Sequence, residues 1–370
     1  MTSRPDAIVV GAGIVGAACA EALAADGLRV LIVEARFAGS GATGSAMGHL
    51  VVMDDSEAQF ALTAYSCRLW RQRAAELPAD CEDEACGTLW VAADSDELAH
   101  VERKAAFYRE RGVVVEVLDR RALAEAEPSL RPDLPGALRV PGDRVVYPPN
   151  AARWLVESAL ARGAERREGW AVEAIGPRFV AGPGGRIETD FVLNAAGAEA
   201  RRLTPELPVE PRKGHLVITD RYPGFLRHQV AELGYLKSAH TLSAESVACN
   251  VQPRATGQVL VGSSREFVGW DASINRALRD RMLERARYFL PGLARLLGLR
   301  TWVGFRPATP DKLPLVGCWE PGLWVATGHE GLGVTTALAT ARLLADQVAG
   351  RTPEIDPRPY APRRGLPNHA

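Results

Sequence analysis

The sequence predicts an α/β protein in which a parallel sheet covered by helices is interrupted by a lobe built on an antiparallel sheet. Residues 7–33 read as an apolar strand, a glycine-rich turn, a helix and a second strand, which is the pattern of a parallel βαβ unit. Short strand-like runs dominate from Cys86 onward, and a strand, a glycine turn and a long helix follow at residues 323–350. Because the opening pattern returns at the end of the chain, we interpret the strand-rich stretches between as an inserted lobe.

The composition excludes several classes of protein. With 370 residues, 47% of them hydrophobic and 24% charged, the chain is long enough for two domains and a sizeable core. Its 44 Lys and Arg residues are balanced by 45 Asp and Glu residues, so we expect no nucleic-acid partner. The 6 cysteines are scattered and lack the spacing of a zinc site. We therefore expect no metal and reduced thiols.

The sequence also bears on where the protein resides. The first residues lack the long apolar region and cleavage site of a signal peptide. No apolar run approaches the roughly 18 to 20 residues of a membrane span. We expect a cytoplasmic protein without a transmembrane segment, and a peripheral contact with the inner face of the cell membrane stays open.

The opening segment predicts a dinucleotide site. After the strand at residues 7–10, the turn GAGIVG supplies Gly11, Gly13 and Gly16 in the GxGxxG spacing. Backbone N–H groups and the positive end of the following helix can bind a pyrophosphate there, because glycines let the backbone approach it. Glu34 ends the second strand, where its carboxylate can accept ribose hydroxyls and would repel a 2′-phosphate. NADP is thus disfavoured, while NAD and FAD both remain open.

The remaining elements divide between the two predicted domains. Small residues dominate 39–50, an amphipathic helix is expected over 57–76, and a helix over 150–162 is expected to begin with Asn150 as its cap. The nucleotide domain is predicted to comprise residues 1–85, 146–209 and 306–370. The lobe is predicted to comprise residues 86–145 and 210–305, with strands at 87–93, 113–118, 137–140, 214–219, 246–251 and 258–263 and a helix at 273–289.

The ordered set of motifs resembles the D-amino-acid oxidase superfamily of FAD-dependent amine oxidoreductases. The set adds the AAGA turn at 195–198, GFRPATPDKLPLVG at 304–317 and GHEGLGV at 328–334 to the opening turn and the small-residue loop. The resemblance covers almost the whole chain and implies a Rossmann-like FAD-binding domain with an inserted antiparallel β-sheet substrate domain. Within this group, residues 46–62 and CGTLWVAA at 86–93 look like the single-subunit bacterial D-hydroxyproline dehydrogenases.

The resemblance implies that FAD is bound without a covalent link. Sarcosine oxidases attach flavin through a cysteine near the GxRPxT stretch, and residues 302–311 contain none. The turn at 328–333 and the helix after it are expected to face the pyrimidine edge of the flavin, where N–H groups and the helix dipole stabilise negative charge on reduction. The implied cofactor-binding residues are Gly11, Gly13, Ile14, Val15, Gly16, Glu34, Ala35, Arg36, Ala42, Thr43, Ser45, Ala46, Met47, Gly48, Val172, Ala195, Ala196, Gly197, Gly328, His329, Gly331, Leu332, Gly333, Val334 and Thr335.

Arg306 is the residue that the resemblance implies for the substrate carboxylate. It stands in GFRPAT at the position where glycine oxidase and its relatives carry that arginine. A planar guanidinium matches a carboxylate in two parallel hydrogen bonds and stays charged. Asn250 falls where glycine oxidase has a pocket tyrosine, and this departure counts against glycine oxidase specificity. The weaker candidates for substrate contact are His49, Tyr235, His240 and Asn250.

The implied reaction is the oxidation of a D-amino or D-imino acid by hydride transfer from the α-carbon to flavin N5, with no protein base required. The leading substrate is cis-4-hydroxy-D-proline, which would give a pyrroline carboxylate. Alternatives are a glycine, sarcosine or other D-amino-acid oxidase or dehydrogenase, a flavin-carrying subunit of a heteromeric dehydrogenase, and an NAD-dependent dehydrogenase. The electron acceptor stays open between oxygen, a quinone and an electron-transfer protein.

Overall fold

The computed structural model describes residues 4–234 and 245–364. The chain forms two compact units. Unit 1 comprises Met1–Cys81, Val146–Arg212 and Phe305–Ala370. Unit 2 comprises Glu82–Val145 and Lys213–Gly304.

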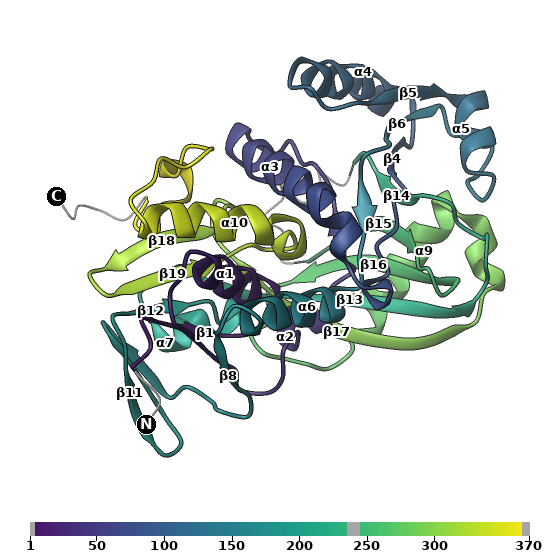
Figure 1. Ribbon diagram of the computed structural model, residues 1–370. Coiled ribbons are helices and arrows are strands. Elements are labelled where there is room, and N and C mark those ends of the chain that lie inside the picture. Colours follow the sequence, from purple (N-terminus) through teal and green to yellow (C-terminus); the bar gives the residue numbers. More distant parts are fainter. Residues whose placement is uncertain (1–3, 235–244, 365–370) are drawn as a thin grey trace. The chain divides into compact units, whose positions relative to one another are not determined.

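Unit 1 is built on a six-stranded sheet whose order is β18-β19-β12-β1-β2-β8 (Figure 1). The central strands run parallel, and only the β18 edge pairs antiparallel with its neighbour. Parallel strands need helical crossovers, which is why these strands are far apart in the sequence. The strands are β1 (Ala7–Val10), β2 (Val30–Val33), β8 (Glu165–Arg167), β12 (Phe191–Asn194), β18 (Leu315–Glu320) and β19 (Leu323–Thr327).

Four longer helices belong to unit 1. They are α1 (Ile14–Ala25), α3 (Glu57–Arg73), α6 (Pro148–Leu160) and α10 (Gly333–Val348). The cap predicted at Asn150 is wrong, because α6 already begins at Pro148 and Tyr147 is its N-cap. Proline suits the first helical turn, since its missing N–H would have no helical partner there. The Asn150 side chain donates instead to the carbonyl of Asp80, at 2.7 Å.

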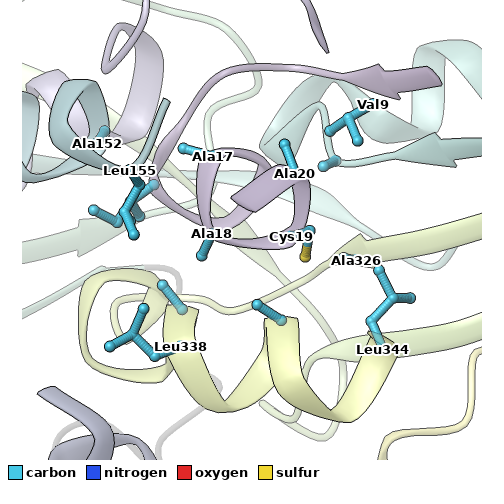
Figure 2. Packing of buried hydrophobic residues seen from close by; sticks show 14 of the residues in the cluster. Val9, Ala17, Ala18, Cys19, Ala20, Ala152, Leu155, Ala326, Leu338 and Leu344 are labelled. Carbon is cyan, nitrogen blue, oxygen red and sulfur yellow. The ribbon is translucent and has the colours of Figure 1, made fainter. Parts of the chain in front are cut away.

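The core of unit 1 depends on small residues along α1. Ala17, Ala18 and Ala20 are at most 1% exposed and lie in one apolar cluster with Leu155 of α6 and Leu338 of α10 (Figure 2). Alanine side chains let the backbones of packed helices approach closely, and a close-packed interior leaves no room for a larger group. Packing against α6 and α10 therefore fixes the position of α1, the helix that follows the glycine turn.

We expect Ala18→Leu to lower the free energy of unfolding by about 1 to 3 kcal/mol, because it forces extra methyl groups into this packed cluster. Ala25 is exposed at the end of the same helix, so Ala25→Leu is a matched control that should change stability by less than about 0.5 kcal/mol. Urea titrations of both variants make the comparison. Equal stability of the two would show that α1 is not closely packed at Ala18.

Unit 2 contains an eight-stranded sheet in the order β17-β13-β16-β15-β14-β4-β6-β5. The lobe was predicted as antiparallel, and most pairs are, but β14 and β4 run parallel. The strands are β4 (Thr88–Ala92), β5 (Glu116–Asp119), β6 (Gly136–Val140), β13 (Glu210–Arg221), β14 (Gln229–Glu232), β15 (Glu245–Pro253), β16 (Gln258–Glu266) and β17 (Gly298–Ala308). The helices among the described residues of unit 2 are α4 (Ser95–Glu110), α5 (Arg120–Ala126) and α9 (Arg276–Phe289).

One face of this second sheet packs on an apolar cluster. Met282 and Phe289 of α9 join Val251 of β15 and Val261 of β16 in it, and all four are at most 1% exposed. Because side chains alternate across a strand, the neighbouring residues of β15 point to the opposite face. That opposite face carries polar residues, including Asn250.

Candidate cofactor and substrate site

The glycine turn between β1 and α1 is closed by contacts that only glycine allows. Gly11 has φ +103°, and a Cβ on it would lie 2.6 Å from the carbonyl oxygen of Ala195. A Cβ on Gly16 would lie 2.0 Å from the carbonyl oxygen of Gly11. Gly13 is the N-cap of α1 and supplies no side-chain cap. The turn thus brings an α-helix N-terminus, with its positive dipole end, next to a backbone that a ligand can approach.

Glu34 lies directly after β2 and is only 9% exposed. One of its carboxylate oxygens accepts the N–H of Ala12 at 2.8 Å, and the other accepts the N–H of Arg36 at 2.9 Å. These bonds fix the carboxylate beside the glycine turn. Each oxygen can accept more than one hydrogen bond, so the group keeps the capacity to accept a ribose hydroxyl.

The small-residue loop is hydrogen-bonded to the N-termini of α1 and α10. Thr43 accepts the N–H of Ile14, the first residue of α1, on Oγ1 at 3.0 Å. Gly48 has φ +96°, and a Cβ on it would lie 2.0 Å from the carbonyl oxygen of Val146. Thr335 at the start of α10 donates its hydroxyl to the carbonyl of His49 at 2.7 Å. These contacts hold the loop beside the starts of α1 and α10, and His49 is half-buried.

The turn after β12 and the segment around Val172 complete the predicted cofactor residues. Ala195 packs against Gly11, and the carbonyl of Gly197 accepts the hydroxyl of Thr327 at 2.9 Å. Val172 is 5% exposed in a second apolar cluster of unit 1, and its carbonyl accepts Arg202 at 3.0 Å. The structure thus brings the predicted residues of β1, β2 and β12 to one edge of the parallel sheet.

The turn at 328–333 leads into α10 without a side-chain cap at Leu332. Gly328 has φ +78°, and a Cβ on it would lie 2.5 Å from a methyl carbon of Thr309. His329 is buried and its Nε2 shares a hydrogen bond with Thr340 Oγ1 at 3.0 Å. Burial lowers the pKa of His329 to about 3, because desolvation penalises the charged form. The imidazole is neutral and directed at α10, so only the backbone of His329 is left for a cofactor.

We expect His329 to make the protein acid-sensitive. Its pKa in the folded chain, about 3, lies below the value of 6.5 for an ordinary histidine, so the unfolded chain binds a proton in this window that the folded chain does not. Stability is therefore lost as the pH falls from 6.5 toward 3, by about 2 kcal/mol at pH 5. Urea titrations at pH 8 and pH 5 should show this loss in the wild type and not in His329→Gln. The exposed His100 on α4 provides a control, since His100→Gln should retain the full loss.

Arg306 lies where β17 enters unit 1, and its side chain packs on the turn at 328–333. A Cβ on Gly331 would lie 3.6 Å from Arg306 Nε. The N–H of Glu330 donates to the carbonyl of Pro307 at 2.9 Å, which fixes the turn against the strand. Arg306 is half-buried, and a cation in such a setting competes less with water for a carboxylate than an exposed one does.

The structure adds an ion pair that the sequence did not predict. Arg212, whose side chain is 7% exposed, lies 3.2 Å from the carboxylate of Glu330 in the same turn. Glu330 was visible inside the motif GHEGLGV, but nothing in the sequence pointed to a partner about 120 positions earlier. The pair holds the Glu330 carboxylate against Arg212 and balances its negative charge.

In unit 2, Asn250 is 8% exposed and lies on the polar face of β15. Tyr235 and His240, also predicted to contact substrate, lie outside the described residues. Within residues 4–234 and 245–364, no cluster of His, Cys, Asp and Glu could hold a metal ion. In the same part of the chain, no helix combines the length and apolar character needed to cross a bilayer.

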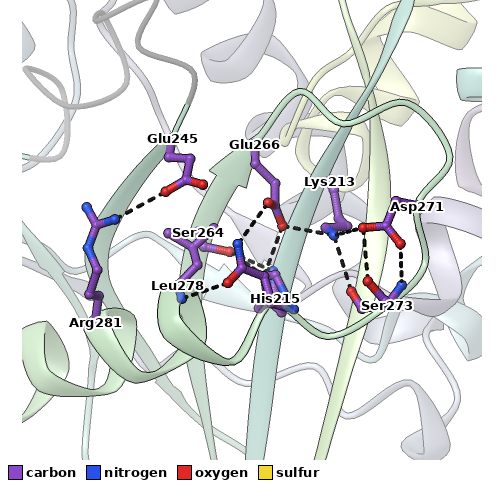
Figure 3. Close-up of polar contacts among 10 residues, drawn as sticks. Lys213, His215, Glu245, Ser264, Glu266, Asp271, Ser273, Leu278 and Arg281 are labelled. Carbon is purple, nitrogen blue, oxygen red and sulfur yellow. Dashed lines mark hydrogen bonds and ion pairs between the residues drawn. The ribbon is translucent and has the colours of Figure 1, made fainter.

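Lys213 in unit 2 belongs to a buried ionic network (Figure 3). Its Nζ lies 3.0 Å from Glu266 and 3.1 Å from Asp271. Burial lowers the pKa of Lys213, but the hydrogen bonds to Glu266 and Asp271 outweigh that effect and raise it overall. Lys213 is therefore a structural cation and not a base. Nearby, His215 Nε2 accepts the N–H of Asn275 at 3.0 Å, which anchors the loop before α9.

Comparison with known proteins decides the family. The DAO family, described as FAD dependent oxidoreductase, matches residues 6–347. The chain belongs to the DAO family. A glycine oxidase from Pseudomonas aeruginosa is 32% identical to it, across 96% of this chain and 98% of the relative. The hydrogen cyanide synthase subunit HcnC of the same organism is 27% identical, across 100% of this chain and 98% of the relative.

Solved structures of DAO-type enzymes share the fold. Glycine oxidase from Geobacillus kaustophilus aligns with a TM-score of 0.87 and 29% identity, across 99% of this chain and 100% of that chain. L-proline dehydrogenase from P. horikoshii aligns with a TM-score of 0.89 and 25% identity, across 98% of each chain. These likenesses confirm the predicted fold class and the predicted cofactor, so this DAO family member is an FAD-dependent oxidoreductase.

The residues of unit 1 fit FAD on chemical grounds. The start of α1 offers N–H groups on a turn that only glycine can form, which suits a pyrophosphate. Glu34 keeps acceptor capacity for a ribose. The start of α10 lacks a side-chain cap, and its N–H groups can stabilise negative charge.

Proposed function

We propose that this DAO family member oxidises a D-amino or D-imino acid, with cis-4-hydroxy-D-proline as the leading substrate. The observation that carries the proposal is the half-buried Arg306, packed against the turn at 328–333. A guanidinium in this place suits the carboxylate that every amino acid carries. Relatives named for glycine and for L-proline oxidation support a small amino or imino acid as the substrate class.

Each unit receives a role in this proposal. Unit 1 binds FAD without a covalent link, through the residues of the α1 and α10 helix starts, the small-residue loop and Glu34. Unit 2 binds substrate through the polar face of its sheet, where Asn250 lies. His49 remains a candidate for substrate contact through its side chain, because its backbone carbonyl already accepts the hydroxyl of Thr335.

The chain's own residues orient the substrate and need not act as a base. Bound FAD would supply the acceptor for the hydride that leaves the substrate α-carbon. Arg306 holds the carboxylate in two hydrogen bonds and so fixes which hydrogen can leave. The lone pair of the neutral amine forms the C=N bond as the hydrogen departs, and a cyclic amine gives a pyrroline carboxylate. Neutral His329 and cationic Lys213 accept no proton in this scheme.

Two alternatives each have one observation in their favour. Identity of 32% with a glycine oxidase favours glycine or sarcosine as substrate and oxygen as acceptor. Similarity to HcnC, which is named as a subunit, favours a flavin-carrying component of a heteromeric dehydrogenase. We place the protein in the cytoplasm and favour a dehydrogenase, with a quinone or an electron-transfer protein as acceptor.

An anaerobic substrate screen tests the proposal. The purified protein should be yellow, and cis-4-hydroxy-D-proline should bleach the flavin absorbance band. Bleaching by glycine or sarcosine alone would instead support the oxidase. A dye-coupled assay on the lone chain after size-exclusion chromatography tests the subunit alternative, because turnover without partners excludes it.

A further inference from the structure

Arg364, near the end of the chain, binds the loop of residues 309–314 that connects β17 to β18 within unit 1. Its guanidinium forms two parallel hydrogen bonds with the Asp311 carboxylate, at 2.7 and 2.9 Å. It also donates to the backbone carbonyls of Leu313 at 2.6 Å and Pro314 at 2.9 Å. The Arg364 side chain is only 16% exposed. One arginine thus joins the C-terminal segment to four oxygen atoms of this loop.

The contact is more than a surface ion pair. Burial raises the pKa of Asp311, but the hydrogen bonds from Arg364 outweigh that effect and lower the pKa overall. The carboxylate is therefore charged, and its two parallel bonds to a guanidinium are of the strong, charge-assisted kind. An exposed ion pair alone would contribute little. The bonds to the carbonyls of Leu313 and Pro314 add direct control of the backbone, because they fix the path of the chain itself.

The 309–314 loop needs such contacts to keep its path. The Leu313 carbonyl, which Arg364 binds, also accepts the hydroxyl of Thr309 at 2.8 Å. The Leu313 N–H donates to the Asp311 carboxylate at 3.1 Å. Lys312 has φ +63°, a conformation that a residue other than glycine keeps only when the surrounding structure holds it there. Removing Arg364 should therefore loosen the loop.

The same stretch of chain supports the turn at 328–333, also in unit 1. The Thr309 methyl group fills the space beside Gly328, since a Cβ on that glycine would lie 2.5 Å from it. Just before the loop, the carbonyl of Pro307 accepts the N–H of Glu330 at 2.9 Å. Thr309 is itself 7% exposed, so it has little room to move. A shift of the loop would therefore be passed to the turn and to the start of α10.

We propose that Arg364 is a positioning residue, which holds the 309–314 loop against the turn at 328–333 and so fixes the start of α10 for the flavin. The backbone N–H groups of a helix start stabilise negative charge on the reduced flavin only while they keep their orientation. Arg364 acts on that orientation through the loop and touches neither cofactor nor substrate. The inference rests on the proposed function, because that proposal places the flavin at the start of α10.

The experiment compares the wild-type holoenzyme with Arg364→Ala in two measurements. Hydrogen exchange, followed by mass spectrometry, should be roughly 10-fold faster at the backbone amides of residues 309–314 and 328–333, and unchanged at residues 7–25. The midpoint potential of the flavin should fall by about 30 mV, which is a roughly tenfold loss in affinity for reduced relative to oxidised FAD. Unchanged exchange at 328–333 would overturn the inference. An equal rise in exchange in every segment would give Arg364 a merely structural role and overturn it as well.

Arg351→Ala is the matched control in the same C-terminal segment. Arg351 pairs with Asp26 at 2.6 Å and with Asp346 at 2.7 Å, at the far ends of α1 and α10 from the helix starts. This variant should lose thermal stability without changing the exchange at 328–333 or the flavin potential. A shift in potential as large as that of Arg364→Ala would show that general loosening of unit 1 is enough, and would overturn the inference.

Two milder variants grade the effect. Arg364→Lys keeps the charge but cannot bind the carboxylate in two parallel bonds, so its flavin potential should fall between those of the wild type and Arg364→Ala. If Arg364→Ala does not fold, Asp311→Asn removes the charge of the pair and leaves the carbonyls of Leu313 and Pro314 in place. It should change exchange and potential in the same direction by a smaller amount.

The two measurements separate failure of this inference from failure of the proposed function. Exchange reports on the turn wherever the flavin lies, whereas the potential reports on the turn only if the flavin is beside it. Faster exchange at 328–333 with an unchanged potential would support the action of Arg364 on the turn and overturn the placement of the flavin at the start of α10. Unchanged exchange would overturn the role of Arg364 and leave that placement standing.

Discussion

Arg306→Ala is expected to lower kcat/KM for the carboxylate substrate by roughly 10²- to 10⁴-fold, since two charge-assisted hydrogen bonds are lost. The loss should appear mainly as a higher KM. FAD should stay bound, because the predicted cofactor contacts come from other residues of unit 1. Steady-state kinetics together with the ratio of flavin absorbance to protein absorbance measure both effects.

Two further variants sharpen this test. Arg306→Lys keeps the charge but cannot form two parallel hydrogen bonds, so it should fall between the wild type and the alanine variant. Arg300 is exposed on the same strand, and Arg300→Ala should leave KM unchanged. A wild-type KM in Arg306→Ala would remove the carboxylate role from this residue and, with it, the main support for the proposed function.

Substitutions in the glycine turn should separate folding from cofactor binding. A Cβ on Gly16 would lie 2.0 Å from a backbone oxygen, whereas a Cβ on Gly13 would meet only the side-chain oxygen of Thr43, at 3.3 Å. Gly16→Ala should therefore lower the free energy of unfolding of the apoprotein by at least about 1 to 3 kcal/mol. Gly13→Ala should leave that free energy nearly unchanged and weaken FAD binding roughly 10- to 100-fold, because the second glycine lets the backbone approach the pyrophosphate.

Urea titration of the apoproteins and titration of each with FAD provide the two measurements. The two variants act as controls for each other, since each is expected to affect one quantity strongly. Full FAD affinity in Gly13→Ala would place the pyrophosphate elsewhere. Unchanged apoprotein stability in Gly16→Ala would mean that α1 can shift away from Gly11 at little cost.

Local features of the sequence were sufficient to predict the opening βαβ unit. The strand and the glycine spacing around Gly11 and Gly16 are short-range patterns, and the structure places β1, the turn and α1 there. The predicted helix cap at Asn150 was wrong because a second local signal, the pair of prolines before it, was given too little weight. Asparagine is a favoured cap, but two prolines directly before it fit the first helical turn better, so the helix begins earlier.

The residues that the sequence did not single out are those whose partners lie far away in the chain. Gln252 looks like any polar residue of a strand, and only the sheet register shows that it is buried across from a satisfied Gln229. The pairing of Arg212 with Glu330 is similar, since neither residue is unusual by itself. Long-range pairs of this kind leave no periodic signal in one sequence.

The sequence by itself determined the class of fold, the family resemblance and the cofactor, because glycine spacing, strand periodicity and the order of motifs are written along the chain. Tertiary structure alone decided which polar groups are satisfied. It directed the His329 ring to Thr340 and left the Gln252 amide buried without a hydrogen-bond partner among the residues that the structure describes. Hydrogen bonding and desolvation depend on which distant segments meet, and that is settled only when the sheets assemble.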